Sequence, residues 1–346
     1  MESQNNLGLA LQSLGKLDEA AACYRRALEL RPDDAGVQWH QALLSLLTGD
    51  FQRGWAGYAQ GWKAKKRQWR DFSQPLWDGR PLEGKTILLH AEQGLGDTIQ
   101  FIRYAARVKQ AGANVIVECQ QPLLRLLAGC RSVDGLIGRG DDLPAFDTHA
   151  PLLSLPGIFH TSLETIPAGA AYLFAEPGLV EHWRGELSAM AGSRIGIVWR
   201  GNPKHANDRD RRLPLSCFEP LARLPGVRLF SLQKEAGAEE LREPRNQFPI
   251  TELGSRLDDF ADTAAVLKNL DLLITCDTAV AHLAGALGVP VWVAIPLVPD
   301  WRWLLDRSDS PWYPTMRLFR QQAPDDWTGV FERIRAALER REDFGF

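Results

Sequence analysis

Apolar and polar positions in the last third of the chain follow the order strand, helix, strand. Residues 270–276 form an apolar run of strand length, residues 279–288 are small, apolar and helical in pattern, and residues 289–296 form a second, β-branched run. This succession predicts a βαβ unit with a parallel sheet. Asp277 and Thr278 lie where the first strand gives way to the helix. We therefore expect them at the carboxyl edge of the sheet, where doubly wound folds bind ligands.

Two interpretations of Asp277 and Thr278 stay open on this pattern. An acid followed by a hydroxyl residue is a good helix N-cap and needs no ligand. The free N–H groups at the start of a helix equally suit a diphosphate. His282 lies about one turn into the helix, where a lone histidine is either a packed core residue or a ligand contact.

The first 34 residues fit a tetratricopeptide repeat. The positions that this repeat requires are occupied by Leu7, Gly8, Leu11, Gly15, Ala20, Tyr24, Ala27 and Pro32. The next 34 residues repeat the pattern loosely, with Gly54 at the position of Ala20. We predict helical repeats over residues 1–70 that dock on the domain that follows, because such units need neighbours to bury their faces. The first repeat begins at Met1, which leaves open whether further repeats precede it.

The second repeat ends in the basic run 63–67. This run is either a solvated helix face or a contact for an acceptor or partner. Residues 71–84, which contain prolines and tryptophan, are predicted to be a linker. The chain then enters a first α/β domain, which we bound at residues 85–176.

The first α/β domain opens with a strand over residues 86–91 and a glycine turn that leads into a helix. Two glycines between strand and helix permit close approach of the backbone to a ligand. Asp97 lies at the start of the helix, and Glu92 and Gln93 lie at the end of the strand. We expect these three side chains to face one crevice, although a helix N-cap is the simpler role for Asp97.

A second α/β domain is predicted over residues 177–325, and a terminal helix over 326–346 is expected to cross back to the first domain. The opening strand of the second α/β domain leads into the polar loop 200–212. This loop is either a solvated loop or a cationic lid over phosphates. A later strand ends in Gln233 and Lys234, which could face the same crevice.

Composition narrows the class of protein. The chain is 45% hydrophobic and 24% charged with a net charge of −3, which is ordinary for a globular protein and does not favour nucleic acid as a partner. Three of the five cysteines lie in apolar patterns, so we expect reduced thiols and a cytoplasmic protein, with a peripheral place at the inner membrane left open. The polar N-terminus does not predict a signal peptide. Charged residues interrupt the apolar run 270–296, which argues against a membrane span.

Together these motifs resemble bacterial tetratricopeptide proteins fused to a glycosyltransferase domain of the heptosyltransferase-like family. That family has the GT-B fold, an α/β architecture of two Rossmann-like domains facing a cleft. The resemblance rests on residues 51–58, 92–104, 199–215, 277–288 and 300–321.

The resemblance implies roles for particular residues. The Gly-Leu-Gly-Asp turn is similar to the turn that carries the family's base, which makes Asp97 the expected catalytic residue. The run from Asp277 to Ala284 is similar to the family's donor motif, which implies diphosphate contacts for Asp277, Thr278 and His282. Ala279 replaces a glycine of that motif, so a heptose donor does not simply carry over. The expected donor-binding residues are Gln93, Gly94, Gly96, Trp199, Arg200, Asn202, Arg209, Gln233, Lys234, Asp277, Thr278, Ala279 and His282.

The resemblance implies an inverting transfer from a nucleotide sugar to a protein or surface glycan, with the repeats recruiting a protein. We expect no cofactor beyond the nucleotide sugar and no metal, because Asp208 and Asp210 lie in an arginine-rich loop. Two alternatives stay open: a sugar-nucleotide epimerase, which would need a second acid or base opposite Asp97, and a non-catalytic scaffold.

Overall fold

The computed structural model describes residues 1–64, 70–169, 171–188, 192–205, 207–243 and 246–340. Its contacts divide the chain into two compact units. The first unit comprises Met1–Cys119, Ser132–Pro167 and Val298–Arg307, and the second comprises Gln120–Arg131, Ala168–Leu297 and Ser308–Phe346. The predicted domain boundaries separate the two sheets. Two short segments belong to a different compact unit from the predicted one: Gln120–Arg131 belongs to the second unit, and Val298–Arg307 belongs to the first.

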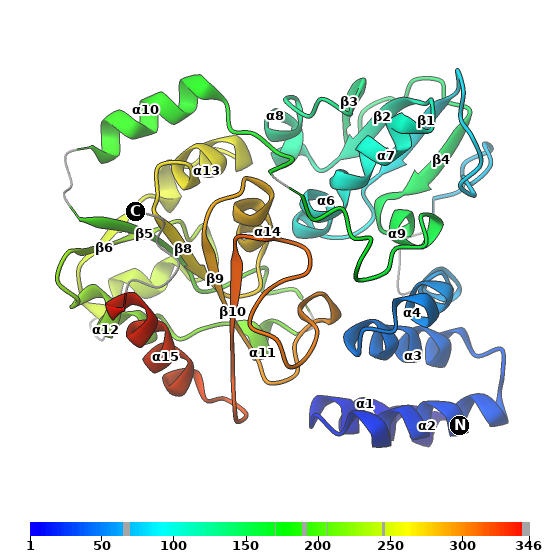
Figure 1. Ribbon diagram of the computed structural model, residues 1–346, viewed down its shortest axis with the longest axis horizontal. Coiled ribbons are helices and arrows are strands. Elements are labelled where there is room, and N and C mark those ends of the chain that lie inside the picture. Colours follow the sequence, from blue (N-terminus) through cyan, green and yellow to red (C-terminus); the bar gives the residue numbers. More distant parts are fainter. Residues whose placement is uncertain (65–69, 170, 189–191, 206, 244–245, 341–346) are drawn as a thin grey trace. The chain divides into compact units, whose positions relative to one another are not determined.

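The first unit begins with the predicted helical repeats (Figure 1). Their helices are α1 (Glu2–Ser13), α2 (Leu17–Leu30), α3 (Ala35–Leu47), α4 (Phe51–Tyr58) and the short α5 (Gln60–Lys63). Gly8 lets α1 and α2 cross closely, because a Cβ at this position would lie 2.5 Å from the ring of Tyr24. Residues 65–67 of the predicted basic run lie outside the described residues.

The departure of the second repeat from the pattern has a packing reason. A Cβ on Gly54 would lie 2.5 Å from Cγ of Leu46 and 3.2 Å from its backbone nitrogen. Leu46 is fully buried, so the space that alanine would need is already filled.

Helix α4 joins the repeats to the rest of the first unit. The indole Nε1 of Trp55 donates a 3.0 Å hydrogen bond to the carbonyl oxygen of Thr161. The ring of Trp55 also packs edge-on against that of Trp301, with centroids 5.3 Å apart. Both tryptophans are buried. The structure thus confirms that the repeats dock on the domain that follows them.

The sheet of the first unit has four parallel strands in the order β3-β2-β1-β4. They are β1 (Thr86–His90), β2 (Asn114–Cys119), β3 (Gly135–Gly138) and β4 (Thr148–Pro151). Helices α6 (Leu95–Phe101) and α7 (Ala105–Gln110) follow β1, and α9 (Leu155–Ile158) follows β4. Strand β1 is the central apolar run, with Ile87, Leu88 and Leu89 fully buried, as expected of a parallel strand covered on both faces.

The predicted linker is packed structure rather than a free connection. Leu76 forms a parallel bridge with His149 of β4, and the backbone N–H of Trp77 donates to the carbonyl oxygen of His149 at 2.8 Å. The side chain of Trp77 is buried. This segment therefore extends the β4 edge of the sheet.

Two buried histidines meet near the carboxyl edge of this sheet. Nε2 of His90 and Nδ1 of His149 are 3.2 Å apart, and the ring of Phe72 packs on both. Arg70 lies over Phe72 and pairs with the buried carboxylate of Glu118. Burial, and in addition the positive charge of Arg70, holds the pKa of His149 below its ordinary value.

The sheet of the second unit has six parallel strands in the order β10-β9-β8-β5-β6-β7. They are β5 (Ser193–Val198), β6 (Val227–Ser231), β7 (Ile250–Glu252), β8 (Leu272–Thr275), β9 (Val291–Ile295) and β10 (Met316–Arg320). Counted from β5, this is the doubly wound Rossmann order. The winding reverses between β5 and β8, so the carboxyl ends of these two strands mark the expected ligand position.

The main helices of the second unit are α10 (Pro177–Leu187), α11 (Asp208–Arg211), α12 (Glu219–Ala222), α13 (Phe260–Leu267), α14 (Ala279–Ala286) and α15 (Trp327–Glu339). The short α8 (Leu124–Leu127) joins this unit, where Arg125 pairs at 3.2 Å with Asp259, the N-cap of α13. The final helix α15 packs on the core of this sheet, with Phe331 against Phe218 at 4.7 Å. The prediction that it crosses back to the first α/β domain is wrong, because its apolar stripe completes this core.

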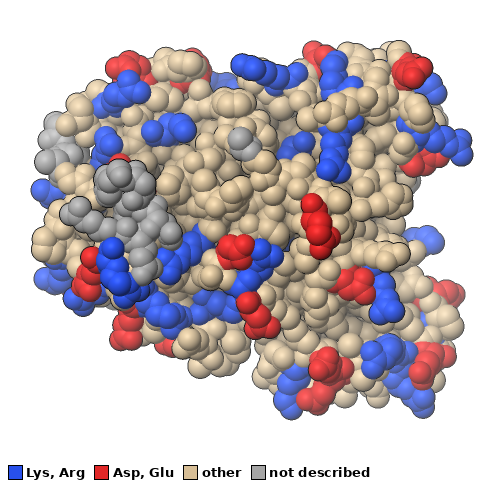
Figure 2. Space-filling model, viewed as in Figure 1, with Lys and Arg blue, Asp and Glu red and all other residues tan. Residues whose placement is uncertain are grey.

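None of the helices in the described part of the chain is both long enough and apolar enough to span a membrane. Lys, Arg, Asp and Glu are interspersed over the face that Figure 2 shows.

The packing of Gly54 predicts that Gly54→Ala destabilises the protein. Overpacking a filled core costs about 1–3 kcal/mol, which exceeds the roughly 1 kcal/mol that alanine gains over glycine inside a helix. Urea unfolding measures the difference. Gly129→Ala is the matched control, because a Cβ at Gly129 meets nothing within 4 Å. Equal midpoints for Gly54→Ala and the unaltered chain would contradict the packing argument.

The buried His149 predicts a loss of stability in mild acid. The pKa of this histidine is about 6.5 in an unfolded chain and lower in the folded one, so between these values the unfolded state binds more protons. The free energy of unfolding should therefore fall as the pH drops through this range, by at most about 1.4 kcal/mol per pH unit from this group. Urea unfolding at pH 7.5 and pH 5.5 tests this.

His149→Phe should flatten the slope, whereas His160→Asn, a change at an exposed histidine with a φ of 49°, should keep it. An unchanged slope in His149→Phe would assign the acid sensitivity to other groups.

Candidate functional site

The glycine turn after β1 places Asp97 at the start of α6. Gly94 is the N-cap of this helix, and its backbone N–H donates a 2.8 Å hydrogen bond to Oδ2 of Asp97. Gly96 lies in the first turn of the helix. The structure thus shows the capping role for Asp97, and it leaves the side chain 19% exposed.

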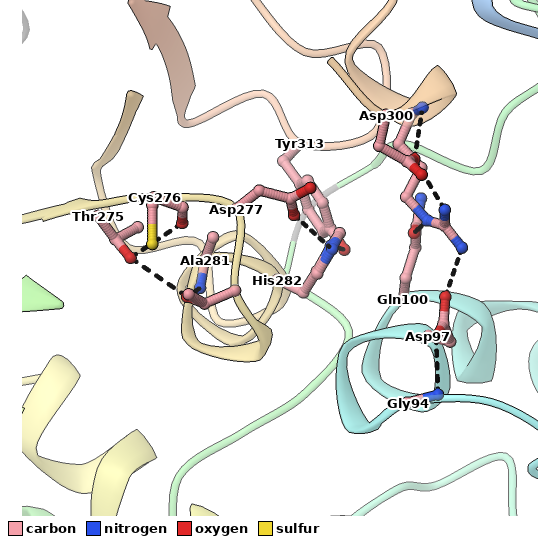
Figure 3. A network of polar contacts seen from close by, with 12 residues as sticks. Gly94, Asp97, Gln100, Thr275, Cys276, Asp277, Ala281, His282, Asp300 and Tyr313 are labelled. Atoms are coloured by element: carbon pink, nitrogen blue, oxygen red, sulfur yellow. Dashed lines mark hydrogen bonds and ion pairs between the residues drawn. The ribbon is translucent and has the colours of Figure 1, made fainter. Parts of the chain in front are cut away.

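A buried arginine holds the other oxygen of this carboxylate. Figure 3 labels Asp97 and two residues near it, Gln100 and Asp300. Arg302 lies in the short turn Trp301–Trp303, and its Nη2 pairs with Oδ1 of Asp97. Its Nη1 donates to Oδ1 of Asp300 at 2.8 Å, and its Nε donates to Oε1 of Gln100 at 2.8 Å. Burial opposes the charge of Arg302, but the carboxylates of Asp300 and Asp97 outweigh it and raise the pKa of the guanidinium above its ordinary value. No local sequence pattern connects Arg302 with Asp97.

The other two residues expected beside Asp97 have structural partners. Glu92 is buried, and its Oε1 accepts a 3.2 Å hydrogen bond from the backbone N–H of Leu153. Gln93 donates through Nε2 to the hydroxyl of Tyr58, at 3.3 Å. Gln93 therefore connects the glycine turn to helix α4 of the second repeat.

In the second unit, Thr278 caps helix α14. Its Oγ1 accepts from the backbone N–H of Ala281 at 3.4 Å and lies 3.2 Å from Oγ1 of Thr275. Figure 3 labels Thr275, which precedes this helix, and Ala281, which lies in its first turn. Ala279 is the first residue of the helix, next to the cap. The capping interpretation is thus confirmed, and the helix still presents its first N–H groups at the carboxyl end of β8.

His282 is buried one turn into α14. Its Nδ1 is hydrogen-bonded to the hydroxyl of Tyr313, at 2.9 Å, and its Nε2 lies 3.9 Å from Oδ1 of Asp277. Gly285 makes room for this arrangement, because a Cβ there would lie 2.5 Å from the ring of Tyr313. The histidine is therefore packed, as its position in an apolar helix suggests, and it also orients the acid at the helix start.

Trp199 and Gln233, both predicted to bind the donor, are buried. Trp199 is fully buried in the core of the sheet. Gln233 is 3% exposed, and its Oε1 accepts from the backbone N–H groups of Trp199 and Arg200, both at 3.1 Å. Its Nε2 donates to the carbonyl oxygen of Arg200 at 3.0 Å. Gln233 therefore fixes the backbone at the end of β5.

One arginine of the loop after β5 lies near the start of α14, and another pairs within the loop. Arg200 pairs with the buried Asp208 at 3.4 Å. A Cβ built on Gly201 would lie 3.1 Å from Nη2 of Arg211 and 3.6 Å from Cγ2 of Thr278, so these residues adjoin. The Nε of Arg211 is buried and has no hydrogen-bond acceptor among the described residues.

Two other predicted contacts in this loop are exposed. Asn202 uses its Oδ1 to accept from the backbone N–H of Lys204 at 2.9 Å, and Arg209 lies on the surface of α11. The structure brings Arg211, which we did not single out, to the helix start instead. Sequence reasoning had no means of choosing among four arginines in one loop.

A cavity of about 550 Å³ opens at the carboxyl ends of β6 and β7. Its lining mixes charged and apolar side chains: Gln233, Lys234, Glu235, Ala238, Leu241, Arg242, Glu252, Gly254, Ser255, Leu257 and Asp258. The Nζ of Lys234 donates to the carbonyl oxygens of Leu257 and Asp258. Lys234 thus holds the loop before α13 and adds a positive charge to the wall.

Two observations concern metals and thiols. Among the residues that the structure describes, no group of three or more His, Cys, Asp or Glu side chains gathers as metal ligands. Cys23, Cys119 and Cys276 are buried thiols, as predicted. Burial raises the pKa of Cys119 to about 12, which makes it a packing residue and not a nucleophile.

Two family models match parts of the chain. The tetratricopeptide repeat model matches residues 2–34, and the model of glycosyltransferase family 9 (heptosyltransferase) matches residues 222–295. The second match includes Lys234, Asp277, Thr278 and His282, and Asp97 lies outside it.

Among curated proteins, Protein FlbA of Caulobacter vibrioides is 26% identical over 370 residues. The alignment takes in 97% of this chain and 61% of FlbA, so the chain spans about three fifths of that protein's length.

Solved structures show the fold of the α/β part. A glycosyl transferase family 9 protein from Veillonella parvula matches with a TM-score of 0.52 and 12% identity, over 77% of this chain and 92% of that one. The ADP-heptose LPS heptosyltransferase II of E. coli matches with a TM-score of 0.50 and 13% identity, over 74% of this chain and 99% of that one. The chain thus joins a tetratricopeptide repeat to the GT-B fold of heptosyltransferase-like glycosyltransferases.

Proposed function

We propose that this protein is an inverting glycosyltransferase that moves a sugar from a nucleoside diphosphate to a hydroxyl of a protein or surface glycan. The observation that carries the proposal is the unsatisfied Nε of Arg211 beside the start of α14. A buried guanidinium donor without an acceptor is costly, and a helix start attracts anions. A diphosphate would satisfy both.

The donor nucleoside fits the cavity at the ends of β6 and β7. A volume of about 550 Å³ lies within the range of small-molecule sites. Glu252 and Asp258 on its wall can accept hydrogen bonds from ribose hydroxyls or base amines. Gln233 lines this cavity and also holds the backbone of Arg200, next to Gly201 and Thr278. Gln233 therefore links the cavity wall to the loop in which Gly201 lies beside Arg211 and Thr278.

The transfer itself moves one proton and one glycosyl group. The acceptor oxygen forms a bond to the anomeric carbon, and the bond from that carbon to the diphosphate oxygen breaks with its electron pair. Asp97 takes the acceptor proton as general base. The charge that develops on the leaving nucleoside diphosphate is stabilised by Arg211 and the N–H groups of α14. The proposed mechanism uses these residues and no metal ion.

In this proposal the repeats bind the acceptor. Tetratricopeptide helices bind other proteins along their faces, so a protein acceptor or a partner that carries one is expected there. The cytoplasmic location predicted from the buried thiols belongs to the same proposal.

A thermal-shift panel of nucleoside diphosphates and their sugars tests the donor site. A ligand that binds only the folded state raises the melting temperature by mass action. We expect one nucleotide to stand out. Arg211→Met should weaken binding of the diphosphate roughly 10- to 100-fold, because a charged hydrogen bond contributes about 1.5–3 kcal/mol, and should leave binding of the nucleoside alone intact. Arg209→Met, an exposed neighbour, is the matched control.

No shift with any nucleotide would favour the non-catalytic scaffold. A loss in Arg209→Met equal to that in Arg211→Met would mean that the loop acts only through its overall charge.

The base is tested separately by Asp97→Asn. This variant keeps an oxygen for the Gly94 N–H but cannot take up the acceptor proton. We expect the same melting temperature shift with nucleotide and a fall in kcat of about 100-fold or more, measured as release of nucleoside diphosphate. Asp78→Asn, an exposed aspartate that pairs with Arg80, is the control. Full turnover in Asp97→Asn would remove Asp97 as the base.

A further inference from the structure

We propose that Arg302 and Asp300 form a positioning pair that aims Asp97 and lets it change its protonation state. The proposal rests on the function given above. It concerns a turn, Asp300–Trp303, that none of the matched family segments contains.

The guanidinium of Arg302 uses all three of its nitrogens. Nη2 holds Asp97, Nη1 holds Asp300, and Nε holds Gln100. The guanidinium is planar and has three fixed partners, so it holds one oxygen of the Asp97 carboxylate in a defined position. The backbone N–H of Gly94 holds the second oxygen, and together they fix the orientation of the carboxylate. Only 9% of the Arg302 side chain is exposed, against 19% for Asp97. A substrate can therefore reach the acid, while the arginine stays behind it.

The charges explain why two carboxylates face one arginine. If Asp97 were the sole partner of Arg302, its protonation would leave a buried cation without a counter-ion, which is strongly unfavourable. Asp300 removes this obstacle, because its carboxylate pairs with Arg302 at 2.8 Å and leaves the guanidinium a second counter-ion when Asp97 takes the proton. The cluster then passes from a net charge of −1 to neutral.

The second repeat holds the turn that carries this pair. The ring of Trp301 packs on Trp55 at 5.3 Å and on Tyr58 at 6.4 Å, both from α4. Arg302 lies over the Trp301 ring at 4.3 Å. Tyr58 also accepts the hydrogen bond of Gln93, one residue before the cap of α6. Helix α4 thus contacts both sides of the Asp97 cluster, and the repeat is part of the machinery that orients the base.

The test compares Asp300→Asn with Arg302→Ala in the full chain, with the donor that the thermal-shift panel selects. Asp300→Asn is isosteric and keeps Oδ1 for the arginine. We expect it to lower kcat about tenfold, with the KM for donor unchanged. Arg302→Ala should lower kcat about 100-fold or more, and low-millimolar guanidinium chloride should restore part of it in a saturable way. A purely structural arginine would not give such rescue.

Arg80→Ala is the matched control, because Arg80 is an exposed arginine of the same unit whose side chain pairs with Asp78 at 3.1 Å. It should keep the wild-type rate, with no response to guanidinium. Wild-type kcat in both Asp300→Asn and Arg302→Ala would overturn this inference and leave the proposed function standing. An unaltered chain that releases no nucleoside diphosphate from any donor would overturn the proposed function, and this inference with it.

Discussion

The direction of the strands is the constraint on which the rest of the structure depends. Every ladder described between named strands in the two sheets is parallel. In each sheet the turns from strand to helix therefore emerge at one edge. In the first sheet this edge carries Gly94 and Asp97, and in the second it carries Arg200, Lys234 and Thr278. Residues distant in sequence meet because their strands end together.

Polar groups at these edges are held by a few fully used side chains. Gln233 binds the backbone of Trp199 and Arg200 on both its amide atoms, and Arg302 binds three side chains at once. Such networks stabilise a structure only when each member finds its partners. The Nε of Arg211, which has no acceptor among the described residues, differs from this pattern and is the donor on which the proposed diphosphate position rests.

The sequence predicted what depends on local pattern and missed what depends on distant contacts. The apolar runs located β8, α14 and β9, and the glycine turn located Asp97 at a helix start. Arg302 lies 205 residues beyond Asp97, so no local pattern joins them. The burial of Trp199 follows from core residues contributed by several strands and helices. The pairing of His282 with Tyr313 likewise depends on a glycine 28 residues before that tyrosine.

The return of Val298–Arg307 to the first unit ties the two halves of the chain together covalently more than once. The chain cannot be divided by a single cut into two pieces that each contain a whole compact unit. A fragment that ends before residue 298 would keep the repeats and the first sheet but lose Asp300 and Arg302. To produce either unit separately, its three segments must be joined by new linkers. An exchange of the first unit between relatives must include the ten residues Val298–Arg307.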